Sequence, residues 1–506
     1  MDRPNIVMIM ADDMGAWAMG CAQNKDVITP NIDALAEDGV LFENFFCASP
    51  VCSPARASVL TGTMPSVHGV HDWISRGNLP GQQFNGKTMP EVEYIGHLTA
   101  YTELLAESGY ECALSGKWHL GSSLKPQKGF SRWFTIGQGG CNYFSPDVVE
   151  DGKLTVRKEY VTDLITRDAV KNIRELSQGD KPFYLSVHYT APHCPWDRKN
   201  HKERIWKMYR NCRYSSTPAC GRLHPLLTNE PRMFSPLQRK NRLRGYYSAM
   251  TGMDEGIGEI TAALKDAGIY DNTVVIFTSD NGMSMGHHGV FGKGNATYPQ
   301  NMYDSAVKVP FIISGNTLGL KKGTHCTGLY SHCDIMPTLI DMLSLPADRV
   351  KQRLPGKSFA PLLRGEGEEE SKSVVVTGEY GMSEMIRTER YKLVVREGSF
   401  DEFYDLLNDP GEKINLAGSC PPEAKKLKEE LARFMAENSD PVYRCKGEDV
   451  KGSGQVASLA ADKNGAFDAF CGYRSPFRAK RFLKNPSPEK SVRTKRRSAW
   501  SAVLLP

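Results

Sequence analysis

Short, continuous apolar runs alternate with longer amphipathic stretches along the first part of the chain. The first apolar run covers residues 6–10 and is followed directly by Asp12 and Asp13. A run without polar interruption is typical of a strand that is buried on both faces. The next segment predicts a helix over residues 30–37, with Thr29 as its N-cap and a proline in the first turn.

The same alternation predicts several further elements. Helical spacing covers 101–107, 164–176 and 237–267, whereas short apolar runs cover 110–115, 183–188 and 273–279. The last run again ends in polar residues, Asp280 and Asn281. Strands separated by helices predict an α/β domain with a large, mostly parallel sheet. Because ligands bind at the carboxyl ends of strands in such sheets, we expect the functional site at these acids.

The pattern changes after a Gly- and Glu-rich stretch near 365–373. Short strand candidates separated by turns follow, and then a helix over 422–438, which together predict a small antiparallel sheet with one helix. We therefore expect a main domain over 1–365, a small C-terminal α+β subdomain over 374–445, and an extension over 446–506. We predict no structure for the extension, which ends in a basic tail that we expect to be mobile.

Composition narrows the class of protein. Of the 506 residues, 40% are hydrophobic and 24% are charged, which is usual for a globular protein. The formal net charge is +5, but residues 474–497 hold ten Lys or Arg against one Glu; without these nine net charges the chain carries −4. The body therefore lacks the basic surface of a nucleic-acid-binding protein.

The chain also lacks the sequence features of membrane insertion and export. No apolar stretch approaches the roughly 18 residues of a membrane span, and the N-terminal apolar run is too short for a signal peptide. The 13 cysteines have no regular spacing, which fits reduced thiols. We expect a cytoplasmic protein, or a periplasmic or secreted one if a signal was trimmed, with no membrane or nucleic-acid partner.

Two predicted strand ends supply oxygen donors that suit a metal ion. Asp12 and Asp13 follow one strand, and Asp280 and Asn281 follow another. Carboxylate and amide oxygens, without His or Cys, suit calcium or magnesium rather than zinc. Adjacent acids also occur as simple loop caps, so either pair alone supports both interpretations.

Cys52 begins the run Cys-Ser-Pro-Ala-Arg just ahead of a predicted helix. Pro54 fits the first turn of this helix, where unpaired backbone N–H groups favour an anion. Arg56, one turn further on, adds a planar fork of donors that suits an oxyanion. The alternative interpretation is a small buried thiol followed by an ordinary helix.

Cys52, Pro54 and Arg56, followed by Leu-Thr-Gly, resemble the signature of the formylglycine-dependent sulfatases of the alkaline phosphatase superfamily. The segment 109–119 resembles a second element of this family, Gly-Tyr followed by Gly-Lys-Trp-His. In the family's order, the resemblance covers about residues 4–440. It includes the two acidic strand ends, the Ala-Pro-His turn at 191–193 and the Gly-Lys-Gly run at 292–294. This resemblance implies an alkaline phosphatase-like main domain and a bacterial-type carbohydrate sulfatase.

The resemblance also implies the residues of the site. The catalytic set is Cys52, Arg56, Lys117, His119, His193 and Lys293. The metal ligands are Asp12, Asp13, Cys52, Asp280 and Asn281, with Ca²⁺ as the cofactor and Mg²⁺ as the alternative. Lys117 and His119 are two residues apart, so an extended segment would project both toward one face.

In this family the implied chemistry depends on a modified cysteine. A maturation enzyme converts Cys52 to formylglycine, whose hydrate attacks sulfur and forms a covalent sulfate ester. His193 or Lys293 then protonates the departing alkoxide, and His119 deprotonates the remaining hydroxyl to release inorganic sulfate. The implied function is hydrolysis of a sulfate ester to an alcohol and sulfate.

A long basic insertion at 194–236 is expected to lie over the mouth of the site. Its cations, among them Lys207, Arg210 and Arg213, favour an anionic substrate such as a sulfated sugar or a glycosaminoglycan fragment. Two alternatives remain open, a phosphonate monoester or phosphodiester hydrolase of the same superfamily and a non-catalytic glycan-binding homologue. The presence of every implied site residue argues against the second.

Overall fold

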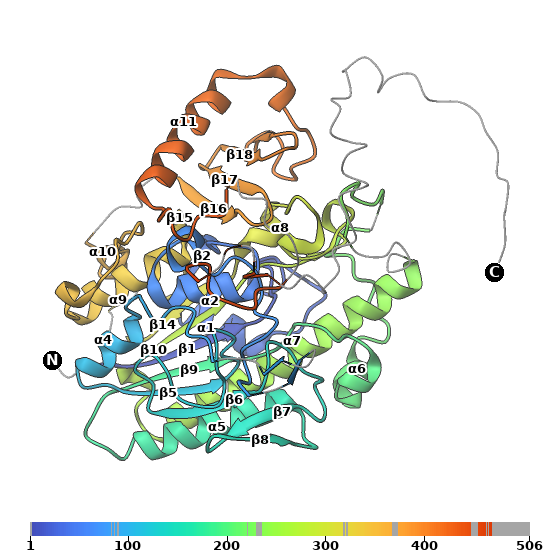
Figure 1. Cartoon of the computed structure of the whole chain (residues 1–506). Coiled ribbons are helices and arrows are strands. Elements are labelled where there is room, and N and C mark those ends of the chain that lie inside the picture. Colours follow the sequence, from blue (N-terminus) through green and yellow to red (C-terminus); the bar gives the residue numbers. More distant parts are fainter. Residues whose placement is uncertain are drawn as a thin grey trace.

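The computed structural model describes residues 3–81, 83–84, 87–88, 91–219, 221–228, 235–316, 319, 322–366, 373–446, 454–461, 463 and 465–467. A large sheet lies at the centre of the molecule with helices on both faces, and a smaller sheet carrying one long helix packs beside it (Figure 1). Among the described residues, no helix combines the length and apolar character that a membrane span requires.

Five parallel strands form the centre of the large sheet, in the order β10, β1, β9, β5, β6. Their bounds are β10 (Thr273–Ser279), β1 (Asn5–Ala11), β9 (Phe183–His188), β5 (Glu111–Gly116) and β6 (Arg132–Ile136). Every residue of β1, β9 and β10 is buried. The predicted α/β class with a large, mostly parallel sheet is confirmed.

The two edges of this sheet depart from the parallel pattern. β14 runs antiparallel to β10 and to β2, and β7 runs antiparallel to β6 and β8. The edge strands are β14 (Phe311–Ser314), β2 (Gly39–Phe46), β13 (Lys308–Val309), β15 (Thr324–Ser331), β7 (Asp147–Glu150) and β8 (Lys153–Val156). The hydrophobic pattern did not predict these strands. Four of them, β13, β14, β7 and β8, are only two to four residues long, and β8 is also fully exposed.

Helices cover both faces of the sheet and create two separate cores. One face carries α1 (Pro30–Glu37), α5 (Val161–Leu176) and α7 (Pro236–Asp266); the other carries α2 (Cys52–Thr61), α4 (Tyr101–Glu107) and α9 (Ile335–Leu343). Met8 and Met10 belong to the core beneath α2 and α4, whereas Val7 and Ile9 belong to the core beneath α5 and α7. This alternation explains why β1 is uninterrupted apolar sequence.

The start of α1 is capped from another helix rather than by its own N-cap residue. Thr29 makes no capping bond; its hydroxyl accepts from the Gly20 N–H instead. The carboxylate of Asp254, on α7, accepts from the backbone N–H groups of Asn31 (3.0 Å) and Ile32 (2.8 Å). Thr29 occupies the N-cap position, as predicted, but its side chain makes no capping bond, because the carboxylate of Asp254 already accepts from the free N–H groups.

The predicted C-terminal sheet and helix are both present. Strands β16 (Val374–Gly378), β17 (Ser383–Arg387), β18 (Tyr391–Arg396) and β19 (Glu402–Asp405) pair antiparallel in that order. Helix α11 (Pro422–Glu437) covers β17 and β18 and buries Leu427, Leu431 and Met435, which are four residues apart.

Part of the extension packs against the main domain. Gln455 is fully buried; its side chain accepts from the His71 N–H (2.9 Å) and donates to the Gly69 carbonyl (2.9 Å). Phe467 stacks on Tyr380. The expectation of no structure beyond residue 446 is therefore wrong for 454–461 and 465–467, where long-range hydrogen bonds replace a local pattern. The basic tail at 474–497 lies outside the described residues.

Candidate active site

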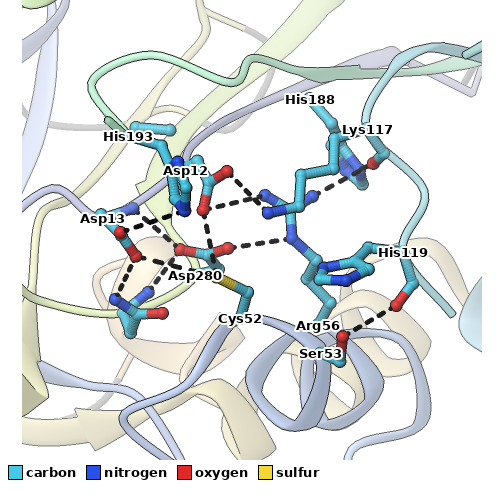
Figure 2. Close-up of polar contacts among 12 residues, drawn as sticks. Asp12, Asp13, Cys52, Ser53, Arg56, Lys117, His119, His188, His193 and Asp280 are labelled. Carbon is cyan, nitrogen blue, oxygen red and sulfur yellow. Dashed lines mark hydrogen bonds and ion pairs between the residues drawn. The ribbon is translucent and has the colours of Figure 1, made fainter. Parts of the chain in front are cut away.

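Three chain segments meet at the carboxyl ends of β1 and β10. Because these strands are parallel neighbours, with Ala11 beside Ser279, the acids that follow them lie together. Helix α2 begins at this point, and Figure 2 shows Cys52 at its start, directed toward Asp12, Asp13 and Asp280. Cys52 is the first residue of the helix rather than the residue just ahead of it.

The acidic residues form a cluster whose oxygens suit a divalent cation. One ligand atom from each of Asp12, Asp13, Cys52 and Asp280 lies within 4.8 Å of all the others. Asn281 donates its amide to Asp13 Oδ1 (2.8 Å), while its own Oδ1 is buried without a hydrogen-bond partner among the described residues. An unsatisfied buried amide oxygen beside three carboxylates fits a calcium or magnesium ligand set.

The charges around the cluster set the protonation of its acids. Burial raises the pKa of Asp12 more strongly than Lys117 lowers it. Burial also opposes the charge of Asp280, but Arg56, Lys117 and Lys293 outweigh it and hold the pKa of Asp280 well below its usual value. Arg56 Nε lies 2.9 Å from Asp280 Oδ2, so this ion pair fixes the guanidinium within the site.

Cys52 is held between an acid and an ammonium group. Its Sγ lies 3.3 Å from Asp12 Oδ1 and 2.6 Å from the Nζ of Lys293, which also donates to Asp13 Oδ1 (2.6 Å). Burial, reinforced by the charge of Asp12, raises the pKa of the Cys52 thiol well above its usual value. Because the thiolate is the nucleophilic form, the unmodified Cys52 is a poor nucleophile here.

Lys117 and His119 follow β5 and reach the cluster in different ways. Lys117 Nζ lies 2.7 Å from Asp12 Oδ2, whereas His119 Nε2 lies 3.0 Å from the Ile74 carbonyl oxygen. The segment is not extended through His119, whose φ is 61°, so the expectation of two side chains on one face of an extended segment is wrong. A left-handed residue redirects the chain at this point.

The hydrogen bond of His119 determines its tautomer. A carbonyl oxygen only accepts, so Nε2 carries the proton and Nδ1 is left as an acceptor. Nδ1 is buried and has no partner among the described residues. Burial and then Lys117 lower the pKa of His119 well below its usual value, so the ring is neutral and its Nδ1 keeps an unused lone pair.

His193 has the opposite character. Its Nδ1 donates to the Cys194 carbonyl (2.8 Å), and its Nε2 lies 3.7 Å from Asp13 Oδ2. Burial lowers the pKa of His193, but Cys194, Asp12 and Asp13 outweigh it and raise the pKa to about 10. The ring is therefore protonated near neutral pH. His188, by contrast, bonds to the Lys117 carbonyl through Nδ1, and burial lowers its pKa to about 3.

A pocket of about 1170 Å³ opens above Asp13, His193 and Lys293. Its walls come from residues 194–198 of the insertion, the first turns of α7 and the segment 291–296. Three tryptophans line it, namely Trp73, Trp196 and Trp206. The insertion therefore lies over the mouth of the site, as expected.

The arginines of this pocket are not those that the sequence indicated. Lys207, Arg210 and Arg213 do not line it, because α6 (Glu203–Met208) buries Trp206 and leaves Lys207 exposed. Arg198, Arg242 and Arg244 line it instead. The sequence did not indicate that Arg242 and Arg244 line a pocket, because arginines on a helix usually face solvent.

The chain is similar in sequence to known sulfatases. The sulfatase family model matches residues 4–345, and a model described as the C-terminal part of N-sulphoglucosamine sulphohydrolase matches residues 286–440. The chain is 28% identical to an N-acetylglucosamine-6-O-sulfatase of Bacteroides thetaiotaomicron, over 86% of each protein. It is 27% identical to a choline-sulfatase of Rhizobium meliloti, over 82% of each.

Solved structures share the fold of this chain. The structure of BT4656 in complex with its substrate D-glucosamine-2-N,6-O-disulfate has a TM-score of 0.68 and 26% identity, covering 86% of this chain and 97% of that one. A phosphonate monoester hydrolase of Agrobacterium radiobacter shares the fold, with a TM-score of 0.64 and 22% identity over 86% of this chain and 96% of that one. Since the family model spans the greater part of the chain, this protein belongs to the sulfatases, which are sulfuric ester hydrolases.

Proposed function

We propose that this sulfatase removes a sulfate group from an anionic saccharide, releasing an alcohol and inorganic sulfate. One observation carries the proposal: the side chain of Cys52 lies among three carboxylates and within 2.6 Å of the Lys293 ammonium. A sulfate ester is itself an anion, so the nucleophile needs cationic groups around it. The site provides them beside position 52.

The proposal includes oxidation of Cys52 to formylglycine by a maturation enzyme, with an external oxidant that accepts the electrons and with release of the thiol sulfur. Formylglycine supplies an aldehyde, and its hydrate offers a hydroxyl as the nucleophile in place of a thiol that is held protonated. The position at the first turn of α2 exposes the modified side chain to the unpaired N–H groups of that turn.

Asp12, Asp13, Asp280 and Asn281 would hold the divalent cation, with Ca²⁺ as the first choice and Mg²⁺ as the alternative. A bound cation supplies neutralisation of the sulfate oxygens and of the nucleophile. The free Oδ1 of Asn281 and the clustered carboxylate oxygens support this assignment.

The remaining side chains divide binding and proton transfer between them. Lys117 and Lys293, each paired with an aspartate, hold their ammonium groups within reach of the sulfate oxygens. The guanidinium of Arg56 adds a further positive charge. His193, protonated at neutral pH, donates a proton to the leaving alkoxide. His119 accepts a proton through its free Nδ1.

The substrate class is supported by the relatives and by the pocket. One relative is an N-acetylglucosamine-6-O-sulfatase, and a structural neighbour holds a glucosamine disulfate. The pocket above Lys293 is large enough for a sugar, and its three tryptophans offer flat faces for a pyranose ring.

Mass spectrometry of the peptide that contains residue 52, combined with turnover assays, tests the proposal. We expect an aldehyde in place of the thiol, hydrolysis of sulfated monosaccharides, and loss of turnover in Cys52→Ala with the fold retained. Faster turnover of an aryl phosphodiester or a phosphonate monoester than of an aryl sulfate would contradict it. Full hydrolysis by Cys52→Ala would contradict the role of position 52.

A further inference from the structure

The substrate pocket has more cationic groups than the cleaved sulfate requires. The cationic lining residues are Arg198, Arg242, Arg244, Lys293 and the protonated His193, and the acidic ones are Asp13 and Asp197. Lys293 is paired with Asp13 at the floor of the pocket. The three arginines lie on the walls of the pocket, Arg198 in the insertion and Arg242 and Arg244 on α7.

Two of the three arginines already have partners within the protein. Arg198 forms a two-point ion pair with Glu203, at 3.0 Å and 2.7 Å. Arg244 donates its Nε to the Trp206 carbonyl (2.7 Å), and its guanidinium lies 4.5 Å from the centre of the Trp206 ring. Both side chains therefore hold the pocket wall in place.

Arg242 differs from them. It makes no hydrogen bond or ion pair with any residue in the described ranges, and its Nε is buried without a partner. The side chain is half-buried on the wall of the pocket. Burial lowers the pKa of this guanidinium, and the nearby Cys194 only partly compensates. A buried, unsatisfied donor of a charged group is unfavourable unless a ligand completes it.

The surroundings of Arg242 define what this ligand is. Gln238 lies four residues earlier on α7, hence on the same helix face, and also lines the pocket. A guanidinium presents a planar fork of donors that matches a carboxylate or a sulfate. Gln238 adds an amide that can bond to a sugar hydroxyl.

We propose that Arg242 forms a second anion subsite, which binds a carboxylate or a further sulfate on the saccharide whose sulfate ester is cleaved beside residue 52. This inference rests on the proposed function and names the substrate class more closely: saccharides with at least two anionic groups. Arg242 is a specificity residue, whereas Lys117 and Lys293 serve the sulfate that is removed.

Binding measurements on a Cys52→Ala background test the subsite without turnover. Quenching of tryptophan fluorescence reports occupancy, since three tryptophans line the pocket. The probes are glucosamine 2-N,6-O-disulfate, N-acetylglucosamine 6-sulfate, and a disaccharide of a hexuronate with N-acetylglucosamine 6-sulfate. The first probe carries a second sulfate and the third carries a carboxylate. The second probe has the 6-sulfate as its single anionic group.

We expect Arg242→Gln to weaken the Kd of one or both doubly anionic probes by roughly 10- to 100-fold, the effect of losing a charged hydrogen bond. The Kd of the singly sulfated sugar should stay within about twofold, and Arg242→Lys should retain part of the affinity. The probe that responds distinguishes a sulfate from a carboxylate. Arg210→Gln is the matched control, because Arg210 is exposed and outside the pocket.

Equal weakening of all three probes, or no weakening of any, would overturn the subsite. A thermal unfolding midpoint of Arg242→Gln equal to that of the parent protein excludes misfolding as the cause. The proposed function fails separately: absence of sulfate ester turnover by the wild-type enzyme would overturn it, while the difference in Kd on the inactive background would still establish the subsite.

Discussion

Lys293 Nζ lies 2.6 Å from Cys52 Sγ and 2.6 Å from Asp13 Oδ1, although 241 and 280 residues of sequence separate it from these partners. Burial opposes the charge of Lys293, but Asp13 and the other acids outweigh it and raise its pKa well above the usual value. The Lys293 side chain is therefore positively charged at neutral pH and lies beside Cys52.

Replacing this ammonium should slow the chemical step. We expect Lys293→Met to lower kcat for a sulfate ester by roughly 10²- to 10³-fold, the usual effect of removing one donor that stabilises developing charge. Steady-state kinetics measures this, with the formylglycine content of each preparation determined in parallel. Lys322→Met, which removes an exposed surface ammonium paired with Asp38, serves as the control. An unchanged kcat with full conversion would contradict the role of Lys293.

Removing the cation should abolish activity and lower thermal stability together. A ligand that binds only the folded protein stabilises it by about 2.7 kcal/mol at 100 times its Kd. We expect Ca²⁺ to raise the unfolding midpoint of chelator-treated enzyme, and Asn281→Ala to need higher Ca²⁺ for the same rise because it removes the free Oδ1 ligand.

Calorimetry with Ca²⁺ and with Mg²⁺ compares the two ions in the same protein. Asn408→Ala, at an exposed turn of the C-terminal sheet, is the control for loss of an amide. If Asn281→Ala shows the same dependence on Ca²⁺ as the parent, Asn281 is not a ligand.

The pH dependence of stability should depend on Asp254, away from the site. Burial raises its pKa from 3.8 to about 6, although the backbone N–H groups of Ile32 and Asn31 partly oppose the shift. Between these values the folded protein binds a proton that the unfolded chain has released. This carboxyl therefore favours the folded state at low pH, and the contribution is lost as the pH rises through 6.

The variant Asp254→Asn does not titrate, so it should gain stability relative to the parent as the pH rises from about 4 to about 7. The relative change is on the order of 2 kcal/mol. Thermal unfolding midpoints across this pH range give the measurement, with Asp271→Asn as the surface control. A difference between parent and variant that stays constant with pH would refute the assignment.

The buried Gln455 should support the pocket through Trp73. The Gln455 backbone accepts from Ser75 and donates to the Trp73 carbonyl (2.7 Å), and its side chain satisfies His71 and Gly69. We expect Gln455→Ala to lower stability by about 1 to 3 kcal/mol, since it leaves buried groups unpaired. Loss of the side-chain bonds to His71 and Gly69 should loosen residues 69–75, which include Trp73 of the pocket wall, so KM for a sulfated saccharide should rise more than KM for a small aryl sulfate.

Ser458→Ala, in the same segment, provides the comparison for a small change without loss of these bonds. Saccharide and aryl sulfate kinetics that change in parallel would show that Gln455 acts on global stability alone.

Much of the sheet and part of the site were predictable from local pattern. The uninterrupted apolar runs of β1, β9 and β10 identify strands that are buried on both faces, and their ends place Asp12 and Asp280 at one edge of a parallel sheet. The motif around Cys52 correctly predicted that a helix begins at this point.

Other features depend on contacts between distant segments. The cap of α1 comes from Asp254 on another helix, and the short edge strands exist because longer strands pair with them. The turn at His119 and the order of Gln455 likewise depend on partners far along the chain. Local propensity carries no information about such partners.

Residue types and their spacing along the chain were enough to predict the family, the central sheet and the residues that we propose for the chemistry. Which cations line the pocket depends on how distant segments pack together. The insertion turns Lys207 away from the pocket, while α7, folded against the central sheet, presents Arg242 to it without an internal partner. The packing of the apolar face of a helix determines which side chains its opposite face presents to a pocket. The pattern of charges alone therefore does not show which arginine a ligand contacts.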